Sequence, residues 1–237
     1  GGESRTVRPT DMKAIILAAG EGRRLLPLSL ATPKPLLSVA GKPLIQHHIE
    51  ALVKANIKEL VINLNHLGEQ IEKALSNGSK WGASIDYSHE GELLETGGGI
   101  LNALHLLGDE PFAVVNGDIF TDYDFSKLPV SLPADILGHL VMVDNPLEHA
   151  DGDYGFTGEK IDRLSVLGPS RDNRLTYSGI SVLRSELLLQ RAPGRFPLRD
   201  LLNPAVESRQ LSGEHYRGVW TDVGTVDRLE ALRASLQ

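Results

Sequence analysis

Cysteine is absent from the sequence, and aromatic residues make up only 5% of it. Without cysteine the chain forms no disulfides, has no thiolate ligands for zinc or iron–sulfur clusters, and has no thiol nucleophile. An excess of positive charge is also lacking, because 31 acidic residues outnumber 24 basic ones and leave a formal net charge of −7. Neither a nucleic acid nor an anionic membrane surface is therefore expected as a partner.

Long hydrophobic runs are missing as well. No apolar stretch approaches the roughly 20 residues that a membrane-spanning helix needs, and the first residues show no signal-peptide pattern. The composition, 41% hydrophobic and 23% charged over 237 residues, is typical of a folded chain that is long enough to bury a core. These features predict a soluble, cytoplasmic protein without a membrane partner.

The first eleven residues differ from the rest of the chain. Gly1–Asp11 is polar, contains Pro9 and has no hydrophobic periodicity, so we expect a tag remnant or a flexible extension. Residues 12–237 contain no internal repeat, low-complexity tract or clear linker, which favours a single domain. The lack of an appended domain favours a monomer or a weak dimer.

Strand and helix patterns alternate along the first half of the chain. Short apolar runs predict buried strands, and apolar residues at helical spacing predict the helices between them. The expected strands are 14–17, 59–63, 84–88 and 112–116. The expected helices are one that Pro43 opens, one around 68–75, and one that 97–99 opens and Gly108 caps. This alternation predicts an α/β fold with an open, mixed but mainly parallel sheet and helices on both faces.

The second half of the chain has a different pattern. Residues 138–143 and 176–183 predict strands, 154–164 a hairpin, and 225–236 a closing helix. We expect this antiparallel-looking insert to form a small lid-like subdomain on the main sheet.

The loop after the first strand carries the strongest local signal. It contains two glycines and two arginines, and Lys34 follows between two prolines. Glycines let backbone N–H groups approach phosphate oxygens, and the cations supply countercharge. The dinucleotide-binding fingerprint is excluded because Leu25 stands where its third glycine belongs, and no Gly-Lys-Ser/Thr motif occurs. From these residues alone, an ordinary strand-to-helix turn with surface cations is the alternative.

Two aspartates stand where strands run into turns. Asp118 follows the strand 112–116, and Asp222 comes late in the chain, just before Gly224. Open α/β sheets bind ligands at the carboxyl ends of their strands, and two carboxylates there could hold one Mg²⁺. A turn or helix-cap aspartate is the alternative for each.

These motifs resemble those of the sugar nucleotidyltransferases. Residues 17–28 and 33–35 are similar to the family pattern Leu-Ala-Ala-Gly-x-Gly-Thr-Arg-Leu-x-Pro-Leu-Thr followed by Pro-Lys-Pro, with departures at Arg23 and Ser29. The resemblance continues in the family's order through 96–98, 116–118, 177–179 and 221–225. It implies a Rossmann-like sheet of the nucleotide-diphospho-sugar transferase type. It also implies transfer of a nucleotidyl group from a nucleoside triphosphate to a sugar 1-phosphate.

The resemblance also implies roles for individual residues. The expected catalytic residues are Arg24, Lys34 and Asp118, and the expected Mg²⁺ ligands are Asp118 and Asp222. The expected nucleotide-binding residues are Ala18, Ala19, Gly20, Glu21, Gly22, Arg23, Lys34, Glu90, Thr96, Gly97 and Gly98. The expected sugar-phosphate-binding residues are Asn116, Asp153, Tyr177, Ser178 and Gly179. Glycine costs about 1 kcal/mol relative to alanine inside a helix, so the glycines at 97–99 also predict a close backbone approach to a ligand.

Three details narrow the resemblance within the family. Glu95–Gly99, Asn116–Asp124 and the short C-terminal end are most similar to members that use UTP and N-acetylmuramate 1-phosphate in peptidoglycan recycling. Glucose-1-phosphate thymidylyl- or uridylyltransferases and mannose-1-phosphate guanylyltransferases share most of the motifs and remain alternatives, as does a non-catalytic nucleotide-sugar sensor.

The carboxylate of N-acetylmuramate needs a cationic partner. Arg174, Arg195 and Arg199 are the candidates, although the sequence favours an exposed surface charge as the interpretation of each.

Overall fold

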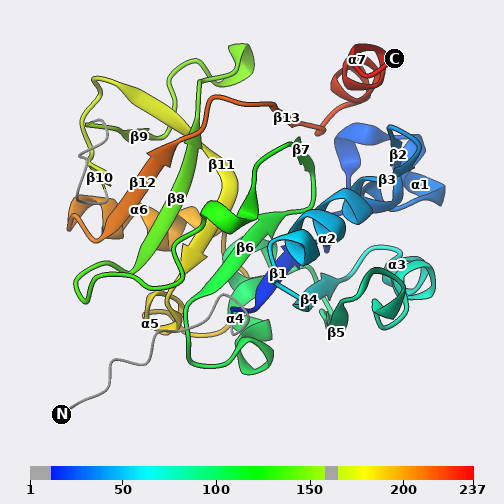
Figure 1. The fold of residues 1–237 in the computed structure, drawn as a ribbon, viewed down its shortest axis with the longest axis horizontal. Helices are drawn as coiled ribbons and strands as arrows, with labels where there is room; N and C mark the ends of the chain where they lie inside the picture. Colours follow the sequence, from blue (N-terminus) through cyan, green and yellow to red (C-terminus); the bar gives the residue numbers. More distant parts are fainter. Residues whose placement is uncertain (1–11, 158–164) are drawn as a thin grey trace.

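A computed structural model describes residues 12–157 and 165–237 of the chain, so the predictions for 1–11 and for part of the 154–164 hairpin lie outside the described residues. The strands of the main sheet are β1 (Ala14–Leu17), β4 (Glu59–Leu64), β5 (Ser84–His89), β6 (Phe112–Asn116), β8 (Gly138–Val143), β9 (Tyr154–Gly155), β10 (Ser165–Val166), β11 (Arg174–Leu183) and β12 (Leu211–His215). Their order is β10-β12-β8-β11-β6-β1-β4-β5, with β9 beside β11 (Figure 1).

The predicted parallel strands form the centre of this sheet. β1 lies between β4 and β6 and is parallel to both, and β4 is parallel to β5. Successive side chains of a strand point to opposite faces of the sheet. The apolar runs seen in the sequence therefore contribute to two hydrophobic cores, one on each face. Ile16 packs into the core on one face, whereas its neighbour Ile15 packs into the core on the other.

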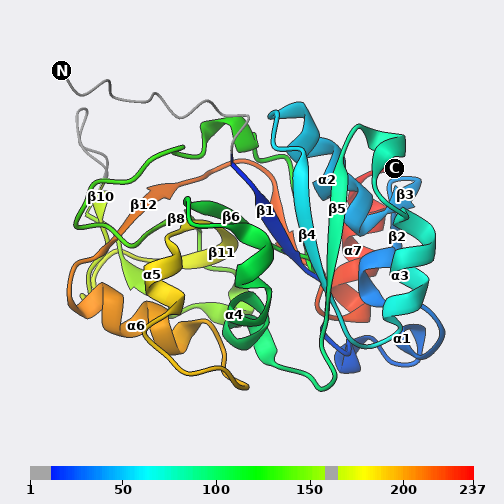
Figure 2. The same cartoon turned by 90° about the horizontal axis from the view of Figure 1, so that it is seen from below.

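Helices cover both faces, as the sequence predicts. The core on one face includes residues of α2 (Leu44–Lys54) and α3 (Gly68–Leu75). The core on the other face includes residues of α4 (Glu95–Leu107), α5 (Ser185–Leu188) and α6 (Arg199–Glu207), which lie together below the sheet in Figure 2. Pro43 caps α2 from just outside rather than occupying its first turn.

The predicted lid-like subdomain is not a sheet of its own in the part of the chain that the structure describes. β11 pairs antiparallel with β6 and β8, and β12 pairs parallel with β8, so these strands extend the main sheet. The partner of β9 in its short ladder is β11. The apolar pattern of 138–143 and 176–183 marks these strands correctly, but it carries no information about which neighbour each one joins.

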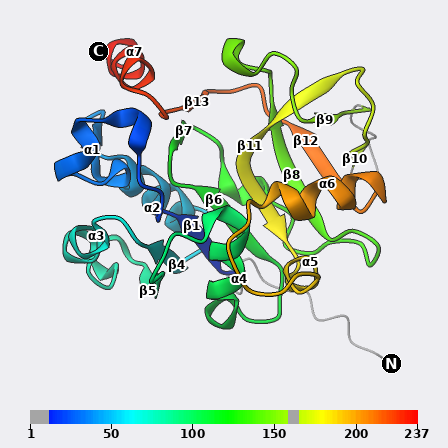
Figure 3. The same ribbon diagram turned by 180° about the vertical axis from the view of Figure 1, so that it is seen from behind.

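The C-terminal segment returns to the first loop of the chain. Its strand β13 (Trp220–Asp222) pairs with β7 (Ile119–Thr121), which follows β6. The helix α7 (Val226–Ser235) then packs, through Leu229 and Leu232, on a third apolar cluster that includes Leu25 (Figure 3). The two ends of the domain are thereby joined beside the loop that follows β1.

The remaining elements are short. They are the helix α1 (Leu28–Ala31), the hairpin strands β2 (Ser38–Val39) and β3 (Lys42–Pro43), and 3-10 helices at Arg23–Leu25, Lys34–Leu36, Ser79–Trp81, Phe125–Lys127 and Leu147–His149. In the two described ranges, no helix combines the length and apolar character needed to cross a membrane.

Candidate active site

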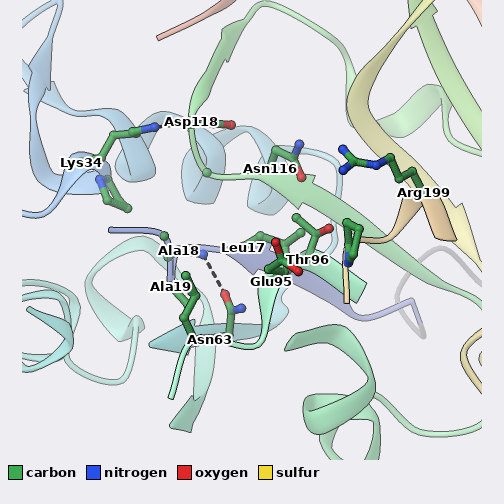
Figure 4. A pocket seen from close by; sticks show the side chains of 15 residues that line it. Leu17, Ala18, Ala19, Lys34, Asn63, Glu95, Thr96, Asn116, Asp118 and Arg199 are labelled. Carbon is green, nitrogen blue, oxygen red and sulfur yellow. Dashed lines mark hydrogen bonds and ion pairs between the residues drawn. The ribbon is translucent and has the colours of Figure 1, made fainter. Parts of the chain in front are cut away.

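A cavity of about 350 Å³ lies at the carboxyl ends of β1, β4 and β6 (Figure 4). Its walls are Leu17, Ala18, Ala19, Gly20, Lys34, Pro35, Asn63, Leu93, Glu95, Thr96, Asn116, Gly117, Asp118, Pro197 and Arg199. This is the edge at which open α/β sheets bind ligands. The structure therefore brings the motifs after β1 and β6 to one cavity, as the sequence predicts.

The start of the first loop is fixed by a buried amide. Asn63 is the next-to-last residue of β4, and its Oδ1 accepts a hydrogen bond of 2.7 Å from the backbone N–H of Ala18. The Nδ2 of Asn63 donates to Glu90 Oε1 at 3.2 Å. Burial raises the pKa of the Glu90 carboxyl, while the hydrogen bond from Asn63 acts in the opposite direction. Asn63 lines the cavity, whereas Glu90, its hydrogen-bond partner, is not among the lining residues, and its predicted role in nucleotide binding stays a prediction.

Sequence reasoning missed Asn63, although a signal existed. It is a polar residue at the end of a buried strand, as Asn116 is at the end of the strand 112–116. A polar side chain at the carboxyl end of a parallel strand faces the ligand edge of the sheet.

A second hollow adjoins the cavity and is lined by the rest of the loop, Glu21, Gly22, Arg23 and Arg24, together with Leu93, Glu95 and Arg195. Arg23 forms an ion pair with Glu21, and its side chain is largely exposed. The Arg24 side chain makes no ion pair or hydrogen bond within residues 12–157 and 165–237, although its charge acts on Asp222. Of the two adjacent arginines, Arg24 is thus the one without an ion pair among these residues.

Lys34 and Asp118 face each other across the cavity mouth. The Lys34 Nζ lies 3.6 Å from Asp118 Oδ2, and the lysine side chain is only 14% exposed. Lys34 begins a 3-10 helix between Pro33 and Pro35, so the backbone that carries it has little freedom. A half-buried cation held in this way interacts more strongly with phosphate charge than a cation in bulk water.

Asp222 has one free carboxylate oxygen. Its Oδ2 accepts a hydrogen bond of 2.8 Å from Arg228 Nη1, whereas its Oδ1 is buried without a partner in the described chain. Burial raises the pKa of Asp222, and the negative charge of Asp118 raises it further. Two carboxylates that repel each other, one with an unpartnered buried oxygen, form a place suited to a cation.

Mg²⁺ fits this donor set, because it prefers oxygen ligands and is commonly held by one or two carboxylates together with substrate phosphates. No group of three or more metal-ligating side chains occurs in 12–157 or 165–237, so within those ranges the pair Asp118 and Asp222 is the candidate donor set.

Gly224 allows the C-terminal segment to approach the first loop. A Cβ atom at this position would lie 2.6 Å from Asp222 Oδ1 and 2.9 Å from Arg24 Nη2, too close for either. Because Gly224 has no side chain, the Arg24 guanidinium and the Oδ1 atom of Asp222 can lie close to each other.

The glycines of α4 allow a close approach of another part of the protein, the segment around Gly194 and Phe196, while their predicted contact with a ligand stays a prediction. A Cβ at Gly98 would lie 2.1 Å from the carbonyl oxygen of Gly194, and one at Gly97 would lie 2.3 Å from the Phe196 ring. The Gly98 N–H donates to Phe196 O at 3.0 Å. Thr96 lines the cavity, but Gly97 and Gly98 do not.

The residues expected for the sugar phosphate divide into two groups. Asn116 lines the cavity, and Gly179 packs against its amide, with the nearest Asn116 atom 2.6 Å from where a Cβ of Gly179 would lie. Asp153 accepts a hydrogen bond of 2.7 Å from the Tyr177 N–H, and the carbonyl of Ser178 accepts one of 2.9 Å from the Trp220 indole. Asp153, Tyr177 and Ser178 do not line the cavity, and their hydrogen bonds join the strands behind its wall.

The three candidate arginines lie in different places. Arg199 lines the cavity, and Arg195 lines the adjoining hollow, 3.8 Å from Glu95. Arg174 is outside both and donates from Nε to the carbonyl of Ser170 at 3.1 Å.

Comparisons with known proteins agree with this geometry. Residues 13–157 match the family described as nucleotidyl transferase. The N-acetylmuramate alpha-1-phosphate uridylyltransferase of Neisseria meningitidis serogroup B is 46% identical over 228 residues, which cover 94% of this chain and 97% of that protein. The mannose-1-phosphate guanylyltransferase catalytic subunit beta of Danio rerio is 31% identical over 90% of this chain but only 61% of its own length.

Solved structures show the same fold. The crystal structure of a UDP-glucose pyrophosphorylase complexed with UDP-glucose superposes with a TM-score of 0.73 and 20% sequence identity, over 94% of this chain and 97% of that one. The mixed, mainly parallel α/β sheet predicted from the sequence is thereby confirmed.

Proposed function

The chain belongs to the nucleotidyl transferase family, and on that premise we propose that it joins UTP to N-acetylmuramate 1-phosphate, giving UDP-N-acetylmuramate and pyrophosphate. The observation that carries the proposal is the 46% identity to an N-acetylmuramate alpha-1-phosphate uridylyltransferase across nearly the whole of both chains. The reaction returns a cell-wall sugar to the nucleotide-linked form, which is a step of peptidoglycan recycling.

The reaction needs positioning and charge neutralisation more than covalent catalysis. A phosphate oxygen of the sugar 1-phosphate attacks the α-phosphorus of UTP in line, and pyrophosphate leaves on the opposite side. No general base is required, because the sugar phosphate is already ionised at neutral pH. Arg24 and the backbone of residues 20–23 bind the triphosphate in the hollow beside the cavity. Lys34 stabilises the charge that builds up where the two phosphates meet.

Asp118 and Asp222 hold Mg²⁺ in this proposal. The ion would neutralise phosphate charge at the reacting groups when it is bound. The free Oδ1 of Asp222 and the carboxylate of Asp118 supply the protein oxygens, and Arg228 fixes Asp222 through its other oxygen. A calorimetric titration of Mg²⁺ into metal-free protein with UTP present tests the site without relying on turnover. The Asp222→Asn variant should bind the ion more weakly than wild type.

The uracil is assigned to the part of the cavity lined by Ala18, Asn63 and Thr96. The Asn63 amide is held from both sides, by the Ala18 N–H and by Glu90, and so presents a fixed wall to a base. Thymine differs from uracil by one methyl group and deoxyribose from ribose by one hydroxyl, and differences of this size are worth a few kcal/mol at most. Some turnover of dTTP is therefore expected.

A matrix of substrates tests the proposal. Four nucleoside triphosphates are combined with the 1-phosphates of N-acetylmuramate, N-acetylglucosamine, glucose and mannose, and pyrophosphate release is followed in the presence of Mg²⁺. The highest kcat/KM is expected for UTP with N-acetylmuramate 1-phosphate. A higher value for glucose or mannose 1-phosphate would refute the sugar assignment while leaving a nucleotidyltransferase. Binding of substrates without any pyrophosphate release would identify a nucleotide-sugar sensor.

A further inference from the structure

Arg199, which lines the cavity, has no ion-pair partner among the described residues. Three arginines lie close together in the sequence, and two of them are paired: Arg191 with Asp200 at 2.7 Å, and Arg195 with Glu95 at 3.8 Å. The Arg199 side chain makes no hydrogen bond or ion pair with residues in the described ranges, although its charge acts on the nearby Tyr154, and it lines the cavity. In a chain with a net charge of −7, an unpaired guanidinium at the wall of a ligand cavity is a specific attraction for an anion.

The segment that carries Arg199 is held rigidly against α4. The N–H of Leu198, the residue before it, donates to Thr96 Oγ1 at 2.7 Å. Two residues earlier, Phe196 accepts from the Gly98 N–H at 3.0 Å and donates its own N–H to the Leu94 carbonyl at 3.1 Å. The segment approaches the helix this closely because Gly98 has no side chain. The glycine motif of α4 therefore places Arg199 relative to the cavity.

Arg199 is separate from the phosphate end of the cavity. Figure 4 shows Lys34 and Asp118 on one side of Asn116, and Arg199 on the other. The transferred phosphate belongs to the Lys34 side in the proposed function, so the Arg199 cation beyond Asn116 suits a second anionic group. The sugar of the proposed substrate carries such a group.

We propose that Arg199 binds the carboxylate of the lactyl ether of N-acetylmuramate 1-phosphate and so selects an acidic sugar over its neutral counterpart. The inference rests on the proposed function, because it names the part of that substrate which Arg199 recognises. A guanidinium offers two parallel N–H donors to a carboxylate, a geometry that adds direction to charge attraction. N-acetylglucosamine 1-phosphate is the matched neutral substrate, because it lacks only the lactyl group.

The Arg199→Ala variant is compared with wild type on both sugars, with UTP as the nucleotide. We expect kcat/KM for N-acetylmuramate 1-phosphate to fall by about 10- to 200-fold, mainly through KM, while the value for N-acetylglucosamine 1-phosphate stays within about threefold. Arg199→Lys keeps the charge but loses the paired donors, so we expect partial recovery. Arg174→Ala removes the same charge outside the cavity and should leave both values unchanged.

Product binding provides a readout that does not depend on turnover. Calorimetry with UDP-N-acetylmuramate and UDP-N-acetylglucosamine should show a loss of affinity in Arg199→Ala for the acidic product alone. An equal loss for both products would mean that Arg199 contacts a part common to the two, and would overturn the inference. No loss for either, or a wild type that does not prefer the acidic sugar, would overturn it as well.

These failures are distinct from failure of the proposed function. A wild-type enzyme that releases no pyrophosphate with UTP and either sugar contradicts the function itself, and the inference falls with it. An active enzyme whose sugar preference is the same in wild type and in Arg199→Ala contradicts the inference alone.

Discussion

The two sides of the cavity are built in different ways. The side proposed for the nucleotide comes mainly from one stretch of chain, β1 and the loop from Ala18 to Pro35, with Asn63 beside it. The side proposed for the sugar is assembled from Asn116 and the 197–199 segment, which are far apart in the sequence. A contiguous loop carries its functional groups on neighbouring residues. The geometry of a wall assembled from distant segments depends instead on how those segments pack. Substitutions on the first side should therefore affect chemistry directly, and those on the second should act on substrate choice and on packing.

The largest effect is expected at Asp118 and Asp222, the two proposed Mg²⁺ ligands. Asp118→Asn and Asp222→Asn should each lower kcat by at least about 100-fold, because loss of a metal ligand removes mainly transition-state stabilisation. Asp86→Asn, an exposed position on β5, is the matched control and should retain normal turnover. Pyrophosphate release at saturating Mg²⁺ measures the effect, and near-normal turnover in either variant would show that the residue in question is not a ligand.

The second effect concerns the cation of the nucleotide side. Lys34→Ala should reduce kcat by about 10²- to 10³-fold, because a positioned charge is worth most as negative charge shifts during transfer. The Kd for UTP should change by less than about tenfold. Lys58→Ala, an exposed lysine outside the cavity, should change neither quantity. A rise in KM with kcat unchanged would make Lys34 a simple binding group.

A smaller effect tests whether packing builds the sugar side. In Gly98→Ala the new methyl group meets a backbone carbonyl, so the 194–199 segment must move. We expect a net loss of roughly 1–3 kcal/mol in the free energy of unfolding, as for other overpacked sites, together with a weaker preference for the acidic sugar. Gly91→Ala has no atom within 4 Å of the new methyl group and is the control. Denaturant unfolding and the two-sugar assay measure both consequences, and unchanged stability with unchanged preference would contradict the packing role.

The smallest effect concerns Glu90 behind the nucleotide side. Burial raises the pKa of Glu90 in the folded protein, so the folded state holds this proton more tightly than the unfolded state does. Its contribution to stability is therefore present below the unfolded pKa and is lost as pH rises through the folded pKa. Glu90→Gln removes this titration while keeping an oxygen for Asn63, so the variant should gain stability relative to wild type as pH rises from 4 to 8. A stability difference independent of pH would contradict the raised pKa.

The sequence predicts the local half of this molecule well. The strand 14–17 and its loop are visible because buried parallel strands are continuously apolar and because phosphate binding needs glycines and cations close together. The strand 112–116 and Asp118 follow by the same reasoning. All of these features depend on neighbours within a few residues.

The assembled half depends on packing that no local pattern encodes. The residues next to Arg199 in the sequence do not indicate that Arg199 lines the cavity and that Arg174 does not. The difference lies in which strand or helix packs beside each arginine. The glycines of α4 are conspicuous in the sequence, but their neighbour Gly194 is almost a hundred residues away. A hydrophobic or charged pattern indicates which face of a helix or strand a residue lies on. It does not indicate which other segment packs against that face.

A crystal structure of the protein with UDP-N-acetylmuramate tests the division of the cavity most directly. The account predicts the uracil beside Ala18 and Asn63, the diphosphate near Lys34 and Asp118, and the lactyl carboxylate within hydrogen-bond distance of the Arg199 guanidinium. A product bound with its sugar against the first loop, or with its carboxylate away from Arg199, would contradict the account.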